Sequence, residues 1–164
     1  MKIRAKTGDI FQIPISDTEF SFGQVVVKNK GALCIVTFDG LHKYDDHFTT
    51  EQILKSKIIL PTDTMDAKIW NGDWMVYSNT PVVDTDLSRP NFKVGLDPVF
   101  ITDYSGQKVK VATEQENGFY DYKFSVAPIR VQNTMKAYFK LADWDPDFDK
   151  LTYNYCAEKS ILTK

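Results

Sequence analysis

The sequence predicts an α+β fold: a strongly curved antiparallel β-sheet or small barrel-like N-terminal half, with C-terminal helices packed against it. Two observations lead to this prediction. First, residues 8–15 and 20–27 are apolar runs separated by a short polar break, a pattern typical of a β-hairpin. Second, the longer segments with helical spacing of apolar residues lie from residue 132 onward. Strands and helices are therefore segregated along the chain, as in other α+β proteins.

The hairpin at residues 8–27 supports the curvature of the predicted sheet. Because side chains alternate along a strand, Phe11 shares one face of the first strand with Ile13 and Ile15. Gly23 lies in mid-strand, where glycine indicates a bulge, a bend or a close approach of another group. Pro14 has no N–H to donate, which predicts a strand end or a sheet edge there. Together these residues predict a bent scaffold with no reactive group.

The middle of the chain continues with short elements. Residues 32–38 are an apolar run that predicts a third strand, so the first three strands form an antiparallel meander. An irregular polar stretch follows at 39–48, then a helix at 49–56 capped by Thr49 and a strand at 57–60 ended by Pro61. Residues 65–70 fit a helix or a strand, and residues 74–77 predict a strand.

The next stretch, 79–97, predicts a long loop, which is either held in place by Val82, Val83, Leu87 and Phe92 or free for function. Residues 98–104 and 107–112 predict a hairpin that turns at Ser105 and Gly106.

The C-terminal third predicts the helices. Residues 114–122 suggest a turn or helical turn around Gly118, and residues 124–131 a broken strand interrupted by Pro128. Residues 132–141 have helical character, with Met135 on the apolar side. The strongest helix prediction covers residues 147–162, because Pro146 suits an early helical position and aspartates follow it.

Length and composition restrict the class of protein. The chain of 164 residues, 43% of them apolar, predicts one domain covering residues 1–164. The net charge of −2 argues against a nucleic-acid or anionic-membrane binder, which would need a basic face. No apolar run approaches the ~20 residues of a membrane span, and Cys34 lies in an apolar run typical of a buried, reduced thiol. We therefore expect a cytoplasmic protein that binds neither nucleic acid nor membrane.

One polar stretch contains both histidines, with two carboxylates between them. Imidazole and carboxylate are the ligands of hydrolytic metal sites, where bound water becomes the nucleophile. Residues His42, Asp45, Asp46 and His47 are thus candidates for a small metal-assisted hydrolase. Their spacing matches no established metal motif, so a solvent-exposed loop whose aspartates cap the next turn is the alternative.

The aromatic residues allow a third class of function. A small-barrel module that binds RNA or peptide would present Phe20, Phe22 or Tyr44 for stacking, although the near-neutral charge weakens this hypothesis. Trp70 and Trp74 fit either a recognition patch or the core. The chain has no nucleotide-binding glycine loop and no Gly-x-Ser-x-Gly elbow. We therefore predict a protein that is not an enzyme and needs no cofactor.

Three stretches of the chain carry a family resemblance. Gly8-Asp9-x-Phe11-x-Ile13-Pro14-Ile15 and Phe20-x-Phe22-Gly23-Gln24-Val25 resemble the opening of the immunity protein 26 family, and residues 68–81, with Trp70 and Trp74, resemble its tryptophan-bearing middle. The resemblance is good over residues 5–39 and loose over 51–81. It departs from the family at Gln24, where an arginine is expected, so no basic role is assigned there.

The resemblance implies a function. Members of this family are bacterial proteins encoded beside polymorphic toxins, and they protect the producing cell by binding its own toxin. It therefore implies a cognate protein toxin as the partner, a nuclease or another toxin that acts in the cytoplasm. The toxin would be neutralised by a stoichiometric complex that blocks its active site or a nearby exosite.

An acidic stretch is the candidate for binding such a toxin. Asp143, Trp144, Asp145, Asp147 and Asp149 interleave carboxylates with aromatic rings. Many toxins of this class are nucleases with positive clefts, which an acidic surface would attract. The alternative is a helix start, in which the acids complement the helix dipole and the aromatics enter the core.

Overall fold

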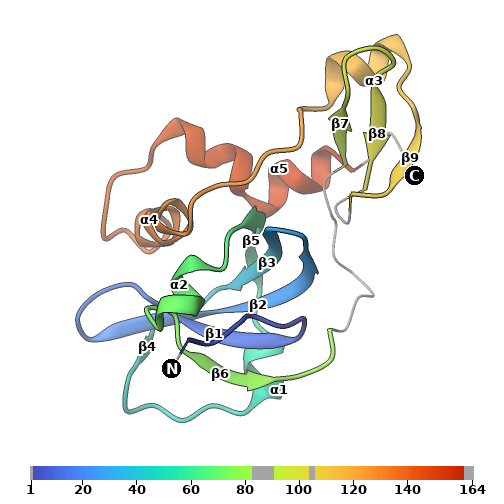
Figure 1. Ribbon diagram of the computed structural model, residues 1–164. Coiled ribbons are helices and arrows are strands. Elements are labelled where there is room, and N and C mark those ends of the chain that lie inside the picture. The colour runs from blue at the N-terminus through green and yellow to red at the C-terminus, as the bar shows by residue number, and fades with distance from the viewer. Residues whose placement is uncertain (1, 83–90, 104–105, 161–164) are drawn as a thin grey trace.

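The computed structural model describes residues 2–82, 91–103 and 106–160, which form two antiparallel sheets and several helices (Figure 1). In the larger sheet the strand order is β5-β3-β2-β1-β6, and β4 pairs with β2. These strands are β1 (Asp9–Pro14), β2 (Glu19–Asn29), β3 (Ala32–Phe38), β4 (His42–Lys43), β5 (Ile58–Thr64) and β6 (Val76–Asn79). The α+β class is confirmed. The sheet is open, because β5 and β6 lie at its two ends, so the barrel-like form is wrong and the strong curvature stays a prediction.

The remaining elements follow the larger sheet in the chain or connect its strands. The smaller sheet has the order β7-β8-β9. Its strands are β7 (Phe92–Val94), β8 (Phe100–Thr102) and β9 (Lys108–Val111). The helices are α1 (Thr50–Leu54), α2 (Ala67–Asn71), α3 (Glu114–Phe119), α4 (Pro128–Tyr138), the 3₁₀ helix η1 (Pro146–Leu151) and α5 (Tyr153–Glu158). Among the described residues, no helix is long and apolar enough to cross a membrane.

The N-terminal hairpin forms as the sequence predicts. Strands β1 and β2 pair antiparallel, with Phe11 opposite Gly23, and β3 pairs with β2 to complete the meander. A Cβ atom on Gly23 would lie 2.6 Å from Cζ of Phe11, so the missing side chain makes room for that ring. The Phe11 ring stacks on Trp74, with centroids 5.2 Å apart and planes 5° apart. Pro14 is the last residue of β1, as its missing N–H predicts.

Both faces of the larger sheet are covered. Helix α4 lies over one face, and α1 with the loop before it lies under the other (Figure 1). The first cluster of buried side chains includes Phe11, Ile13, Val25, Leu33, Val131, Met135 and Leu151. The second includes Phe20, Phe22, Val26, Val36, Phe38 and Ile53. Phe20 and Phe22 therefore lie on the opposite face of β2 from Val25, and each face has its own core.

Gln24 has a structural place in this sheet. Its side chain is buried, and its Nε2 donates to the carbonyl oxygens of Thr80, at 3.2 Å, and Gly8, at 3.4 Å. These bonds tie the start of β1 to the residue after β6. An amide fits this position because both partners are carbonyl acceptors.

The predicted end of a strand at Pro61 is wrong, because β5 runs through it. Strand β5 is at the edge of the sheet, and Pro61 is paired with Val36 of β3. The carbonyl of Pro61 points outward, where it accepts the thiol of Cys156 at 3.5 Å. An edge position tolerates proline because its missing N–H would also point away from the neighbouring strand.

The predicted broken strand at 124–131 is also wrong over its second half. Pro128 is the first residue of α4, and helices accept proline there because the first N–H groups have no partner within the helix. The helix then buries Val131 and Met135 against the sheet. The expected helix at 132–141 therefore exists, but it starts earlier and ends at Tyr138.

The long helix predicted at 147–162 is wrong, since the chain forms two short helices there. Thr152 has extended backbone angles (φ −73°, ψ 152°) between η1 and α5. Its hydroxyl donates to the carbonyl of Asp149 at 2.7 Å and accepts from the amide of Tyr155 at 3.4 Å. Thr152 therefore ends η1 and caps α5. Its hydroxyl bonds to the backbone at the point where a continuous helix would otherwise form. Residues 161 and 162 lie outside the described residues.

Several smaller predictions are settled as well. Thr49 caps α1 and forms a capping box with Gln52, as expected. The hairpin of β8 and β9 is confirmed, although Ser105 of its turn lies outside the described residues. The loop predicted at 79–97 contains strand β7, and Phe92 of that strand is buried. Val82 packs against the second core, while Val83 and Leu87 lie outside the described residues.

Candidate partner-binding surface

The acidic segment, defined here as residues 143–149, lies on the surface between α4 and the end of η1. All four of its aspartates are exposed. The side chain of Asp145 accepts the amide of Asp147 at 2.9 Å and so caps η1, which begins at Pro146. The predicted helix start is therefore present, and it leaves the carboxylates on the outside.

Trp144 is held in place at the surface. Its indole Nε1 donates to a carboxylate oxygen of Asp149 at 2.8 Å. Its ring meets the buried Phe148 edge-on, with centroids 5.5 Å apart. The Trp144 side chain is nevertheless 39% exposed. An aromatic ring fixed in this way presents apolar area with little conformational entropy left to lose on binding.

A loose ion pair joins the acidic segment to α4. Nη2 of Arg130 lies 3.7 Å from a carboxylate oxygen of Asp147, which is 82% exposed. The guanidinium also lies over the Phe148 ring, 5.4 Å from its centroid. At 3.7 Å the two charged groups attract each other without a hydrogen bond. The Asp147 carboxylate therefore keeps the capacity to accept a hydrogen bond from another group.

A pocket of about 410 Å³ opens beside this ion pair. It lies where residues 121–126 cross between the smaller sheet and α4 (Figure 1) and meet η1. Hydrogen bonds hold that crossing segment at both ends: the Lys93 amide donates to the Asp121 carbonyl at 2.9 Å, and the Val126 amide to the Asp63 carbonyl at 2.9 Å. The pocket is thus built from fixed backbone.

The pocket has an apolar interior and a charged mouth. Phe124, Val126 and Leu151 supply its apolar lining. Two further groups face each other at its rim, where Nζ of Lys150 lies 3.8 Å from Oδ1 of Asp121. With Arg130 and Asp147, the mouth carries two cations and two carboxylates.

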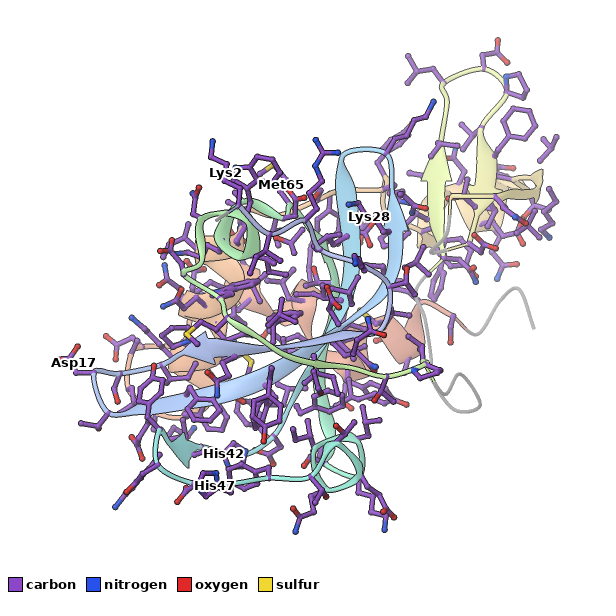
Figure 2. The ribbon with its side chains drawn as sticks, turned by 60° about the horizontal axis from the view of Figure 1, so that its bottom comes forward. Lys2, Asp17, Lys28, His42, His47 and Met65 are labelled. Atoms are coloured by element: carbon purple, nitrogen blue, oxygen red, sulfur yellow. The ribbon has the colours of Figure 1, made fainter. Side chains whose placement is uncertain are left out.

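The histidine stretch occupies the other face of the larger sheet. Figure 2 shows His42, in β4, and His47, in the loop after it, on the far side of the sheet from Lys2 and Met65. The His42 ring packs 4.2 Å from Phe48 and 5.4 Å from Phe22, measured between centroids, whereas His47 is exposed. Burial lowers the pKa of His42, an effect that the nearby Asp46 partly opposes.

The predicted metal ligands do not come together. Asp46 accepts the backbone amide of Lys43 at 2.9 Å, so it stabilises the turn of residues 43–46 rather than the following turn that the structural alternative predicted. In the part of the chain that the structure describes, no three His, Cys, Asp or Glu side chains are grouped as metal ligands. The geometry gives the hydrolase hypothesis no support.

The prediction of exposed rings that could stack on RNA bases is wrong for two of its three residues. Phe20 and Phe22 are each 1% exposed, because His42 of β4 and the residues after it cover them. Tyr44 is 50% exposed and lies against Phe20. One exposed ring out of the three predicted does not form the expected platform for successive bases.

The two tryptophans of the middle region have different surroundings. Trp74 is 1% exposed, and its Nε1 donates to Oε1 of Gln132 at 3.4 Å. Trp70 is half-buried, with Lys2 and Arg4 over its ring at 5.4 and 5.5 Å. The prediction that the tryptophans belong to the core is confirmed for Trp74. Trp70 instead lies beneath the two basic side chains from the N-terminal residues.

Neither cysteine forms a disulfide. Cys34 and Cys156 are both buried. Burial, and to a lesser extent the charge of Asp63, raises the pKa of Cys156 to about 12. A thiol with this pKa is a poor nucleophile at neutral pH.

Comparison with known proteins decides the family. A sequence model described as immunity protein 26 matches residues 6–97, more than half of the chain. The chain belongs to the immunity protein 26 family. No curated protein and no solved structure gives a significant match.

The family match and the candidate surface lie in different parts of the chain. The immunity protein 26 match covers the larger sheet and ends at residue 97, whereas the acidic segment and the pocket come from residues 121–151. Sequence reasoning identified the acidic segment but missed Asp121, Arg130 and Lys150. No sequence signal marks these three, because only the packing of residues 121–126, α4 and η1 brings them together.

Proposed function

We propose that this member of the immunity protein 26 family neutralises a cognate polymorphic toxin in the bacterial cytoplasm by binding it through the acidic segment. The toxin would be a nuclease or another enzyme whose active site carries positive charge. In the complex the toxin would stay folded, but its active site would be inaccessible to its substrate. No cofactor or covalent step is involved.

The observation that carries this proposal is the geometry of the acidic segment. Four exposed aspartates flank Trp144, which is pinned by Asp149 and Phe148 in an exposed position. Charge at the rim of an interface mainly raises the association rate, while a buried aromatic anchor mainly slows dissociation. This segment offers both within seven residues.

The position of the segment outside the family match also supports the proposal. An immunity protein must fit its own toxin, so its binding surface is expected to differ from those of relatives. The sheet matched by the family would then serve as the common scaffold. The C-terminal residues would provide the part that distinguishes one toxin from another.

Co-expression with the toxin encoded beside its gene tests the proposal. We expect cells to survive and the two proteins to co-purify as a 1:1 complex. The double variant Asp143→Asn/Asp147→Asn should slow association about tenfold at low salt, because rim charges steer the encounter. Trp144→Ala should mainly speed dissociation.

A matched control separates this effect from general charge. The double variant Asp17→Asn/Asp45→Asn removes the same two charges from exposed positions outside the segment, and it should bind as the parent does. Unchanged lethality with no complex would reject the toxin-neutralising function. Equal weakening by both double variants would keep the function but reject the acidic segment as its site.

A further inference from the structure

We infer that the pocket beside the acidic segment is a socket for one long basic side chain, an arginine or lysine, of the bound toxin. This inference rests on the proposed function for the identity of the partner. It goes further by assigning a binding role to Asp121, Phe124 and Val126, which lie outside the acidic segment.

The shape of the pocket fits an amphipathic side chain. Its volume of about 410 Å³ exceeds what one basic side chain needs, so entry requires no opening of the fold. Phe124, Val126 and Leu151 form the interior, and the last two are already buried. The aliphatic stem of arginine or lysine packs well on such a surface while its charged head stays at the mouth.

The carboxylates at the mouth are ready to exchange partners. Oδ1 of Asp121 is 3.8 Å from Lys150, and Asp147 is 3.7 Å from Arg130, both beyond hydrogen-bond distance. An incoming guanidinium or ammonium can therefore form shorter, charge-assisted bonds to either carboxylate. Lys150 and Arg130 are partly exposed and can turn toward solvent.

The charge around the mouth selects a cation over an anion. Asp121 and Asp147 balance Arg130 and Lys150, but Asp143, Asp145 and Asp149 of the adjoining segment add only negative charge. These carboxylates repel an anionic side chain and attract a cationic one. The same field that attracts a basic toxin surface thus favours a basic side chain at the pocket.

The backbone and a neighbouring helix fix one of the two carboxylates. The hydroxyl of Tyr155 in α5 donates to Oδ2 of Asp121, which leaves Oδ1 directed toward Lys150. Asp121 is therefore oriented before any ligand arrives. A carboxylate held in this way loses little freedom when it binds a cation.

A toxin-independent probe tests the socket directly. We would titrate the full-length ¹⁵N-labelled protein with the peptide acetyl-Gly-Arg-Gly-amide, and in parallel with its citrulline counterpart, which is neutral and nearly isosteric. The arginine peptide should shift amide signals of residues 121–126, 130 and 147–151 with millimolar affinity. Absence of shifts at these residues, or equal shifts with citrulline, would overturn the inference.

Variants then sharpen the assignment. Asp147→Asn should weaken arginine-peptide binding about tenfold, since a neutral amide makes weaker bonds to a cation. Lys150→Met should strengthen it, because the variant removes a competing cation and keeps the aliphatic stem. Asp45→Asn, on the other face of the sheet, should leave binding unchanged, and an effect equal to that of Asp147→Asn would count against the socket.

The failure of this inference is distinguishable from failure of the proposed function. If the toxin binds with full affinity to both Asp147→Asn and Lys150→Met while the peptide gives no shifts, the socket is wrong and toxin neutralisation stands. If the peptide binds as predicted but no toxin complex forms, the pocket stands as a site for basic side chains and toxin neutralisation falls.

Discussion

Trp74 and Trp144 show how differently this chain uses the same side chain. Each donates its indole N–H to another side chain, Trp74 to Gln132 and Trp144 to Asp149. Trp74 is 1% exposed and stacked on Phe11 in the core, whereas Trp144 is 39% exposed among carboxylates. The first ring stabilises the sheet, and the second is held at the surface.

The same contrast extends to the regions around the two rings. The larger sheet buries apolar side chains on both faces, so almost every change within it alters packing. Around the acidic segment, charged groups lie 3.7–3.8 Å apart across a pocket and remain exposed. A rigid, two-sided core therefore supports a surface that can change without endangering the fold.

The largest expected effect is the loss of the buried ring. Trp74→Ala should lower the free energy of unfolding by about 4 kcal/mol, because it leaves a large cavity against Phe11. Urea unfolding followed by circular dichroism measures this loss. Trp70→Ala provides the comparison within the same region and should cost much less, since Trp70 is only half-buried. Equal losses for the two variants would contradict the assignment of Trp74 to the core.

Gly23 gives the next largest effect. Gly23→Ala places a methyl group 2.6 Å from the Phe11 ring, which cannot move away because it stacks on Trp74. We expect a loss of about 2 kcal/mol from overpacking. In the double variant with Phe11→Leu, the smaller side chain should make the glycine substitution less costly.

Gly118 provides the matched control for this substitution. It lies in α3, and a Cβ there meets no atom within 4 Å. Gly118→Ala should therefore be neutral or stabilise the protein by about 0.5 kcal/mol through helix propensity. A large loss at Gly118 would mean that glycine substitution is costly for reasons other than contact with Phe11.

The N-terminal sheet could be predicted because its signals are local. The alternation in residues 8–27, the glycine opposite an aromatic ring and the proline at a strand end each act on neighbours that the sequence displays. At Pro61 the same local rule was misleading. Whether proline ends a strand depends on the strand's position in the sheet, which tertiary pairing decides.

The C-terminal region was predicted less well for physical reasons that differ by residue. The apolar spacing continues past Thr152 and so predicts one helix through it, but the Thr152 hydroxyl forms a cap that competes with that helix. Asp121 and Arg130 are separated in the sequence from each other and from the acidic segment at 143–149. The pocket they line exists only once residues 121–126 have crossed between the sheets.

A smaller effect concerns the face that carries the histidine stretch. Because burial lowers the pKa of His42 in the folded protein, the unfolded chain, with its ordinary pKa of 6.5, binds more protons below that pH. Stability should therefore fall as the pH decreases from 6.5 toward the folded pKa. Urea midpoints at pH 7.5 and 5.5 measure this dependence, which His42→Gln should reduce. His47→Gln serves as the control, since His47 is exposed. If it reduces the pH dependence as much as His42→Gln does, His42 is not the group responsible.

Apart from the Gly118 control, the smallest expected effect on stability belongs to Trp144. Trp144→Ala removes one hydrogen bond to Asp149 and an edge contact with Phe148, both at the surface. We expect the free energy of unfolding to change by less than about 1 kcal/mol, within the range of surface substitutions. The same variant should shorten the lifetime of the toxin complex. A loss as large as that of Trp74→Ala would instead make Trp144 a structural residue, and the contrast between the two rings would disappear.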